Sequence, residues 1–270
     1  METNEAERTH WNDARWTAVW PKRERLTTEV TVYVLRAAAL QPGERVLDIG
    51  CGGGGTSLAA AAAVGPDGAV VGADVSVPLL GLAGGRAADA GVRHAQFHVV
   101  DMQLDPVPGA PFDVAISQFG VMFFDEPTVA FANIRAQLVP GGRIAFACWQ
   151  EREKNPWIIY GLVAEFVPPP PPPPPGKSPT GPFSLSDAAR TTGILEAAGF
   201  VDVRRTTYEI SVETPPDTVR DDDQLTVLGV PDGNLAEAQA RVDARMAQFV
   251  VSPGISRFPL AFQVFEARVG

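Results

Sequence analysis

The sequence predicts an α/β fold in which a mostly parallel β-sheet is covered by helices on both faces. Short β-rich runs alternate with helical runs along much of the chain, and this alternation is typical of parallel sheets. A glycine-rich turn at Gly50–Gly55 joins the first of these strands to the helix that follows. At 270 residues the chain is long enough to bury a large core within one elaborated α/β domain.

An amphipathic helix precedes the sheet. Apolar residues recur there at helical spacing, namely Leu26, Val30, Tyr33, Val34 and Ala37. We expect Pro42–Gly43 to end this helix, which then delivers the chain to the first strand near Arg45.

From Arg45 onward, strands and helices alternate. Strands are predicted at 45–50, 69–74, about 94–99, 112–117 and 143–149. Helices are predicted between them at about 55–63, 77–90 and 126–138. A later helix over 184–198, capped by Ser184 or Ser186, precedes strands at 201–208 and 260–268.

Three segments fall outside this alternation: 1–40, about 150–183 and about 212–256. The core of the single domain 1–270 is then about 41–149 plus 184–211 and 257–270. Ligands of α/β sheets bind beyond the carboxyl ends of the strands, so insertions attached there tend to roof the site. We interpret all three segments as helical parts of one lid.

Two low-complexity segments lie within these insertions. Pro168–Pro175 is eight consecutive prolines, which predicts a stiff polyproline II connector, with a ligand for a proline-recognising domain as the alternative. Asp221–Asp223 could attract a metal ion, but adjacent carboxylates on a loop are usually solvated, and no metal is expected.

Composition excludes several classes of partner. The formal net charge of −10 argues against nucleic acid, which normally requires a concentrated basic surface. The longest apolar run, Leu58–Val64, is far shorter than the roughly 20 residues that cross a membrane. The first residues lack a secretory signal, and the two cysteines show no metal-ligand or disulfide spacing. We expect a cytoplasmic protein whose partner is a small molecule.

The glycine turn indicates a nucleoside-containing cofactor. Glycines let the backbone approach a ligand closely, and the following helix offers unpaired N–H groups at its start. Gly50-x-Gly52-x-x-Gly55 also fits the dinucleotide pattern of nicotinamide and flavin enzymes. Asp48 would place negative charge where a pyrophosphate has to sit, whereas it suits the cationic, phosphate-free cofactor S-adenosylmethionine.

Asp48-x-Gly50-x-Gly52-x-Gly54 resembles the first motif of class I S-adenosylmethionine-dependent methyltransferases. The turn Leu138–Arg143 and the helix end Ile194–Phe200 are similar to those before the fifth and sixth strands of this superfamily. The resemblance implies a Rossmann-like sheet of seven strands, with the last strand antiparallel between its neighbours. Three shorter stretches resemble a bacterial subgroup related to ubiquinone and menaquinone C-methyltransferases, namely Val121–Pro127, Asn155–Trp157 and Gly181–Phe183.

Further candidate cofactor residues follow the strands. Asp74 ends the second strand about 20 residues beyond the glycine turn, where a carboxylate can accept ribose hydroxyls, and Val75 would pack on the adenine. By resemblance, Asp101 accepts the adenine amino group while the backbone of Met102 meets the ring. The resemblance also places Ser117 and Gln118 beside the methionyl part.

Aromatic residues make up the predicted substrate pocket: Trp16, Trp20, Phe119, Trp149 and Trp157. Their large apolar faces would exclude water and hold a small aromatic or lipophilic acceptor. His10 is the candidate general base because it lies among lid tryptophans. Methyl transfer would then be an in-line displacement driven mainly by proximity and desolvation.

Two other functions remain open from the sequence. One is an NAD(P)-dependent oxidoreductase, which Asp48 and Asp101 disfavour. The other is a non-catalytic cofactor-binding scaffold, which the intact Asp48, Asp74 and Asp101 disfavour. The sequence leaves open the acceptor atom, the use of a base and the oligomeric state, a homodimer included.

Overall fold

A computed structural model describes residues 5–167, 180–219 and 222–270. The proline tract Pro168–Pro175 and Asp221 lie outside the described residues.

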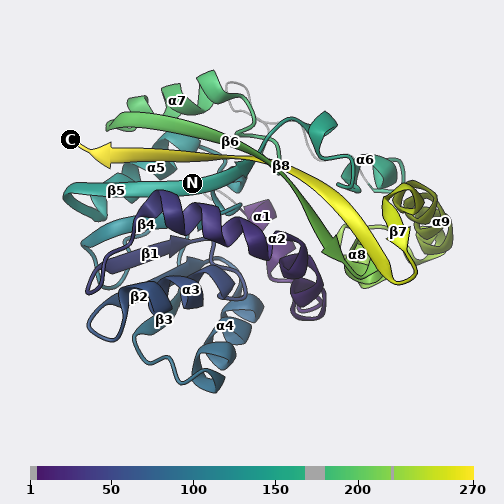
Figure 1. Cartoon of the computed structure of the whole chain (residues 1–270), viewed down its shortest axis with the longest axis horizontal. Coiled ribbons are helices and arrows are strands. Elements are labelled where there is room, and N and C mark those ends of the chain that lie inside the picture. The colour runs from purple at the N-terminus through teal and green to yellow at the C-terminus, as the bar shows by residue number, and fades with distance from the viewer. Residues whose placement is uncertain (1–4, 168–179, 220–221) are drawn as a thin grey trace.

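One sheet forms the centre of the molecule (Figure 1). Its strands in the described residues are β1 (Arg45–Ile49), β2 (Ala69–Asp74), β3 (Ala95–Val99), β4 (Phe112–Gln118), β5 (Leu138–Trp149), β6 (Phe200–Thr214), β7 (Val250–Ser252) and β8 (Ile255–Val269). They lie in the order β3-β2-β1-β4-β5-β8-β6, and the short β7 pairs with β8. Strands β1 to β5 are parallel, whereas β8 runs antiparallel between β5 and β6. The predicted α/β fold with an antiparallel last strand is confirmed, with β7 as an addition.

The helices of the described residues are α1 (Glu5–Trp11), α2 (Trp16–Ala38), α3 (Gly55–Val64), α4 (Val77–Asp89), α5 (Pro127–Ala136), α6 (Tyr160–Val163), α7 (Ala188–Ala197), α8 (Asp222–Val227) and α9 (Leu235–Met246). Short 3-10 turns add η1 (Val121–Phe123), η2 (Arg152–Lys154), η3 (Pro216–Val219), η4 (Asp232–Asn234) and η5 (Ala247–Phe249). Helices α3 and α4 pack with α2, and α5 packs with α7, so that the two groups cover opposite faces of the sheet.

Two predicted helix ends were wrong. Helix α7 begins at Ala188, and its N-cap is Asp187, whose carboxylate accepts the Arg190 N–H. The hydroxyl of the expected cap Ser184 instead donates to the Met122 carbonyl, and that of Ser186 donates to the Phe183 carbonyl. Helix α2 ends at Ala38, before Pro42–Gly43, because Ala39 adopts a left-handed conformation with φ of 47°.

Helix α2 has two different surroundings. In its second half, Leu26, Val30 and Val34 are buried in the main core against the sheet. In its first half, Trp16 and Val19 form a separate apolar cluster with Leu79 and Val227. Only the first half of α2, together with α1, is therefore placed to act as lid, while its second half is part of the core.

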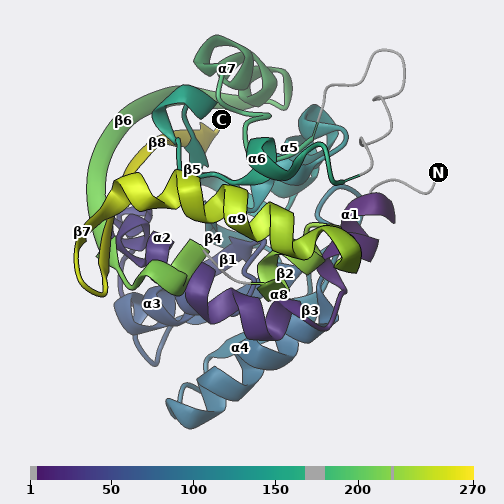
Figure 2. The same ribbon diagram turned by 90° about the vertical axis from the view of Figure 1, so that its right-hand side faces the viewer.

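A long two-stranded ribbon carries the third insertion. Strands β6 and β8 pair from Phe200↔Val269 to Thr214↔Ser256, but β5 covers only 262–268 of β8. The remainder of the ribbon extends beyond the sheet toward β7, α8 and α9 (Figure 1). From that end, α8, α9 and the start of α2 lie in front of the strand ends (Figure 2). The ribbon thus places α8 and α9 over the carboxyl ends of the parallel strands.

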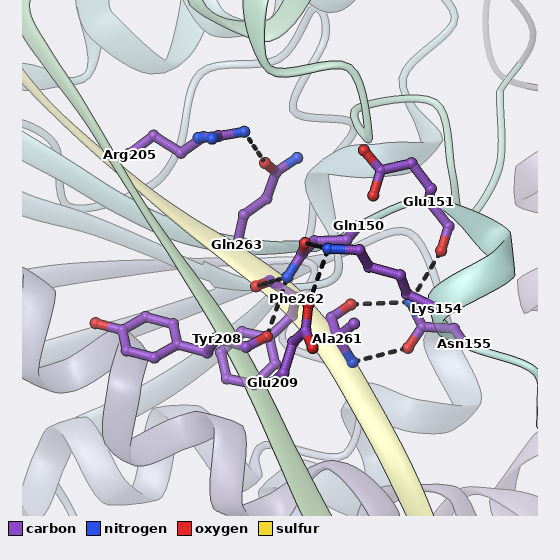
Figure 3. Close-up of polar contacts among 10 residues, drawn as sticks. All are labelled: Gln150, Glu151, Lys154, Asn155, Arg205, Tyr208, Glu209, Ala261, Phe262 and Gln263. Carbon is purple, nitrogen blue, oxygen red and sulfur yellow. Dashed lines mark hydrogen bonds and ion pairs between the residues drawn. The ribbon is translucent and has the colours of Figure 1, made fainter.

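A polar junction ties the start of the second insertion to this ribbon (Figure 3). The side-chain amide of Gln150 donates to the carbonyls of Tyr208 and Phe262 over 3.0 and 2.9 Å. The fully buried Asn155 donates to the Ala261 carbonyl over 2.9 Å and accepts the Ala261 N–H over 3.0 Å. Because β5 ends before this point, Asn155 supplies the hydrogen bonds that a strand would have made.

Replacing Asn155 with alanine is expected to lower the free energy of unfolding by about 1–3 kcal/mol, because it leaves the buried N–H of Ala261 without its acceptor. Urea denaturation followed by circular dichroism measures the effect. Lys154→Ala is the matched control, since its ion pair with Glu209 is exposed and screened by solvent. Equal stabilities of the two variants would contradict the structural role of Asn155.

Candidate active site

A cavity lies at the carboxyl ends of the parallel strands, under the lid. Its strand-end and glycine-turn side is lined by Ile49, Gly50, Cys51, Gly55, Thr56, Ala73, Asp74, Val75, Leu79, Val100, Asp101, Met102 and Gln118. Its aromatic and lid side is lined by Glu7, Trp11, Phe119, Phe123, Phe124, Trp149, Trp157, Ile158, Ile159, Pro182, Thr218, Val219 and Gln224. We call these sides the glycine side and the aromatic side. Trp20, Arg23, Glu24 and Thr27 of α2 line the same cavity.

The glycine turn allows two strand ends to approach closely. Gly50 has φ of +65°, and a Cβ built on it would lie 2.7 Å from the Cα of Gly120. Gly54 has φ of +82°, and its Cβ would lie 2.8 Å from the Cβ of Ala83 on α4. A side chain at Gly50 would therefore push apart the ends of β1 and β4, and one at Gly54 would push α4 away from the turn.

Asp48 lies beneath the turn instead of on the cavity wall. Its Oδ2 accepts the Ser57 hydroxyl over 2.6 Å, while its Oδ1 is buried without a hydrogen-bond partner. Burial raises the pKa of this carboxyl to about 7, against the Ser57 hydrogen bond and with help from the charge of Asp74. A buried carboxylate with one free oxygen favours a cation or a proton nearby.

Asp74 both holds the glycine turn and faces the cavity. Its two oxygens accept the Gly52 N–H over 2.7 Å and the Ser76 N–H over 2.8 Å. Burial raises the pKa of Asp74, and these backbone hydrogen bonds oppose the shift. Each carboxylate oxygen keeps a lone pair, so the group can still accept hydroxyl groups from a ligand.

The other predicted cofactor residues divide into two groups. Val75, Asp101, Met102 and Gln118 line the cavity. The Asp101 carboxylate accepts the Gln103 N–H over 3.0 Å, and the Gln118 amide is tied to α2 by Thr31 and Thr27.

Ser117, Gly52 and Gly54 are absent from the cavity wall, as Asp48 is. The Ser117 hydroxyl is fully buried, donates to the Ile49 carbonyl over 2.7 Å and accepts the Gly120 N–H. It therefore joins β4 to the glycine turn, and its contact with a ligand stays a prediction.

Trp20 packs directly on the glycine turn. A Cβ built on Gly52 would lie 2.1 Å from a carbon of the Trp20 ring, and one on Gly53 would lie 2.6 Å from its Nε1. The Nε1 of Trp20 is buried without a partner. The predicted pocket residue Trp20 is thus brought to the glycine side of the cavity.

Three predicted pocket residues come together on the aromatic side. The rings of Phe119 and Trp149 are stacked, with centroids 3.8 Å apart and an interplanar angle of 10°. Trp157 packs edge-on against Trp149 with centroids 5.3 Å apart. Phe119 has φ of +64°, which is rare for a bulky residue and turns the chain sharply at the end of β4. The result is a flat apolar wall.

The predicted site residues Trp16 and His10 lie outside the cavity lining. Trp16 is fully buried within the lid, where its Nε1 donates to the His10 carbonyl. The His10 ring packs edge-on against Trp11 and Trp16, and neither His10 nor Trp16 lines the cavity. Burial, with the charge of Arg23, lowers the pKa of His10 to about 4. Its imidazole is therefore neutral near pH 7 and held by the lid tryptophans.

Sequence reasoning missed several cavity residues, including Glu7, Thr218 and Gln224. They belong to α1, η3 and α8, which carry no motif and reach the cavity only through the lid. Two polar atoms on the aromatic side, Nε1 of Trp157 and Oγ1 of Thr218, are buried without a partner. Both residues line the cavity, so these atoms are candidates for pairing with a bound molecule or a water.

The described residues contain no helix that is long and apolar enough to span a bilayer. They also contain no group of three or more His, Cys, Asp or Glu side chains that could hold a metal ion. Asp221 lies outside this part of the chain.

Comparison with known proteins identifies the family of one part of the chain. Residues 46–142, from β1 through the turn before Arg143, match the profile of the family described as "Methyltransferase domain". Residues 46–142 are a methyltransferase domain. The sequence prediction of an S-adenosylmethionine-dependent methyltransferase family is thereby confirmed, and the glycine turn, Asp74 and Asp101 all lie within this methyltransferase domain.

Relatives of the methyltransferase domain act on different small molecules. Aklanonic acid methyltransferase of a Streptomyces species is 38% identical over 104 residues, covering 38% of this chain and 47% of the relative. Nocamycin O-methyltransferase of Saccharothrix syringae is 29% identical over 189 residues, covering 65% of each chain. A ubiquinone/menaquinone biosynthesis C-methyltransferase of Ralstonia pickettii is 33% identical, covering 46% of this chain and 52% of the relative. The chain thus spans about half to two thirds of these relatives.

Solved structures show the same fold. The YcgJ protein from a Bacillus has a TM-score of 0.60 at 16% identity, covering 89% of this chain and 98% of its own. Phosphoethanolamine N-methyltransferase 2 of Haemonchus contortus, in complex with S-adenosyl-L-methionine, has a TM-score of 0.59 at 17% identity. That comparison covers 94% of this chain and 57% of the neighbour. At these identities the likeness shows the fold around the methyltransferase domain.

Proposed function

We propose that this chain transfers a methyl group from S-adenosylmethionine to a small, flat, mostly apolar acceptor. The observation that carries this proposal is that one cavity joins the glycine side, with its carboxylates, to the aromatic side. A donor and an acceptor bound on the two sides would meet between Gln118 and Phe119. The proposed partner is a small molecule, and the formal net charge of −10 argues against nucleic acid.

The glycine side fits the cofactor. Asp74 would accept the ribose hydroxyls, while Asp101 and the backbone of Met102 would hold the adenine edge. The unpartnered oxygen of Asp48 would favour positive charge above the turn. When bound, the cofactor supplies a methyl group on a positively charged sulfur. No phosphate needs to be accommodated, which agrees with the carboxylates around this turn.

The aromatic side would position the acceptor and exclude water from it. The stacked Phe119–Trp149 pair and the edge-on Trp157 present flat apolar surfaces to a ring system. Trp11 lines the cavity, and with the lid helices it would shield the reacting atoms from water. Proximity and orientation of this kind can supply about 7–11 kcal/mol of a displacement barrier. The related aklanonic acid and nocamycin methyltransferases, named for small organic substrates, support an acceptor of this size.

Isothermal titration calorimetry tests the cofactor assignment. We expect S-adenosylhomocysteine to bind with a dissociation constant in the micromolar range or lower, and NAD, NADP and their reduced forms not to bind. Binding of a dinucleotide without S-adenosylhomocysteine would favour the oxidoreductase alternative and overturn the proposal. Turnover of S-adenosylmethionine with a panel of phenolic and quinonoid acceptors then separates an enzyme from a scaffold.

A further inference from the structure

One carboxylate that lines the cavity, that of Glu7, takes no part in holding the glycine turn or a cofactor. Of the acidic residues on the cavity wall, Asp74 holds the glycine turn and Asp101 caps its own loop. Glu24 forms an ion pair with Arg86 over 2.7 Å. The remaining one is Glu7, which α1 places on the aromatic side. The surroundings of Glu7 therefore indicate the chemistry of the methyl acceptor.

Glu7 is held in place by two hydrogen-bond donors. The Trp11 indole Nε1–H donates to Oε2 over 2.9 Å, and the Thr180 hydroxyl lies 3.5 Å from Oε1. The Trp11 ring is itself fixed by Trp16, with centroids 4.6 Å apart, and by the edge of Phe123 at 5.3 Å. The carboxylate is thus oriented by a packed support, and its oxygens have lone pairs left for a ligand.

The electrostatic surroundings make Glu7 a better proton acceptor than an exposed glutamate. Burial raises its pKa above the ordinary value, the Trp11 hydrogen bond opposes the shift, and the charge of Asp125 adds to it. The guanidinium of Arg23 is the cation on the same cavity wall. A carboxylate with a raised pKa holds a transferred proton more readily, while the two donors keep it ionised beforehand.

We propose that Glu7 is a catalytic residue that takes the proton from a hydroxyl group of the methyl acceptor; this rests on the function proposed above. The hydroxyl oxygen forms a bond to the methyl carbon with one lone pair, and the carbon–sulfur bond breaks with its electrons remaining on sulfur. The hydroxyl proton passes to the Glu7 carboxylate. Glu7 returns the proton to solvent when the lid opens, so the charge of the protein is restored.

An oxygen acceptor fits the rest of the aromatic side better than an ammonium group. The Trp157 Nε1–H is buried without a partner and can only donate, so it requires an acceptor atom on the substrate. The unpartnered Thr218 hydroxyl can donate to a second oxygen. An ammonium group would leave the Trp157 donor unpaired and would share the cavity with Arg23. The acceptor class is therefore a flat aromatic molecule that carries both a hydroxyl and a carbonyl group.

Alizarin, a dihydroxyanthraquinone whose absorption spectrum changes on ionisation, is a direct probe. Its apparent pKa is measured by spectrophotometric titration while it is bound to the protein loaded with S-adenosylhomocysteine. A neighbouring carboxylate disfavours the bound phenolate, so the ionisation constant is expected to be about tenfold smaller in the wild type than in Glu7→Gln. Glu29→Gln, which removes an exposed carboxylate from α2, is the matched control and should titrate as the wild type does.

Equal titration midpoints in the wild type and Glu7→Gln would overturn the role of Glu7, as would failure of alizarin to bind the loaded wild type. Calorimetry with S-adenosylhomocysteine separates this result from failure of the proposed function. The affinity for S-adenosylhomocysteine should be unchanged in Glu7→Gln. If the wild type did not bind S-adenosylhomocysteine, the cofactor assignment itself would be refuted. With an accepted hydroxyl substrate, Glu7→Gln should lower kcat by about 10²–10⁴-fold and remove the rise of kcat with pH.

Discussion

Replacing Asp74 with alanine is expected to weaken binding of S-adenosylhomocysteine by at least about 100-fold, because two contributions are lost together. The carboxylate would accept ribose hydroxyls directly, and hydrogen bonds to a charged group are worth about 1.5–3 kcal/mol each. It also holds the Gly52 N–H over 2.7 Å, so its removal releases the glycine turn. Isothermal titration calorimetry gives the affinity.

Asp89→Ala provides the control for this variant, because Asp89 is an exposed carboxylate at the end of the neighbouring helix α4. Circular dichroism should show that both variants retain the fold. Asp74→Asn separates the two contributions, since an amide oxygen can still accept the Gly52 N–H while the charge is lost. If Asp74→Ala bound S-adenosylhomocysteine as tightly as Asp89→Ala did, the placement of the ribose beside Asp74 would be untenable.

Replacing Asp48 with asparagine is expected to stabilise the protein without ligand at pH 8. The pKa of Asp48 is raised from the ordinary 3.8 to about 7 by burial, so the folded state disfavours the charged form. Between pH 3.8 and about 7 the folded protein retains a proton that the unfolded chain has lost. The free energy of unfolding therefore falls as the pH rises through that interval. Above pH about 7 the loss is complete, on the order of 2–4 kcal/mol.

Asparagine is uncharged at every pH, and its oxygen can still accept the Ser57 hydroxyl that now donates over 2.6 Å. Thermal unfolding at pH 5 and pH 8 should therefore show a smaller decline in Tm for Asp48→Asn than for the wild type. Asp89→Asn, which changes an exposed carboxylate, should decline like the wild type. A steeper decline in Asp48→Asn than in the wild type would contradict the raised pKa.

The fold was predictable because its signals are local. Strand β1 runs into Gly50–Gly54, and helix–strand alternation around that turn leaves few arrangements of a parallel sheet. The periodicity of 260–268 does not indicate the direction or the neighbours of β8. The antiparallel placement was predicted from the family resemblance. The outer part of the ribbon was missed although Ile210 and Val212 alternate there with the exposed Glu209, Ser211 and Glu213. This alternation is typical of a half-buried strand, but the predicted strand 201–208 ended before it.

The candidate site was predictable on one side only. Asp74, Asp101 and Met102 follow strand ends, so the topology alone brings them to one edge of the sheet. The aromatic side depends on packing between distant segments. Trp16 and Trp20 lie one helical turn apart on α2, yet one faces Leu79 and the other the glycine turn. Spacing cannot distinguish these two surroundings. Glu7 lies in α1, a helix of seven residues that carries no motif.

The central position of β8 has a consequence for synthesis of the chain. Residues 255–269 pair with β5 on one side and with β6 on the other. Until the ribosome has released them, β5 and β6 each lack a neighbour, although the glycine turn and its carboxylates have long been complete. The cofactor side can therefore form early, while α8 and α9, the part of the lid that the ribbon carries, gain their support only with β8. Ligand present during translation would meet a site that this part of the lid does not yet cover.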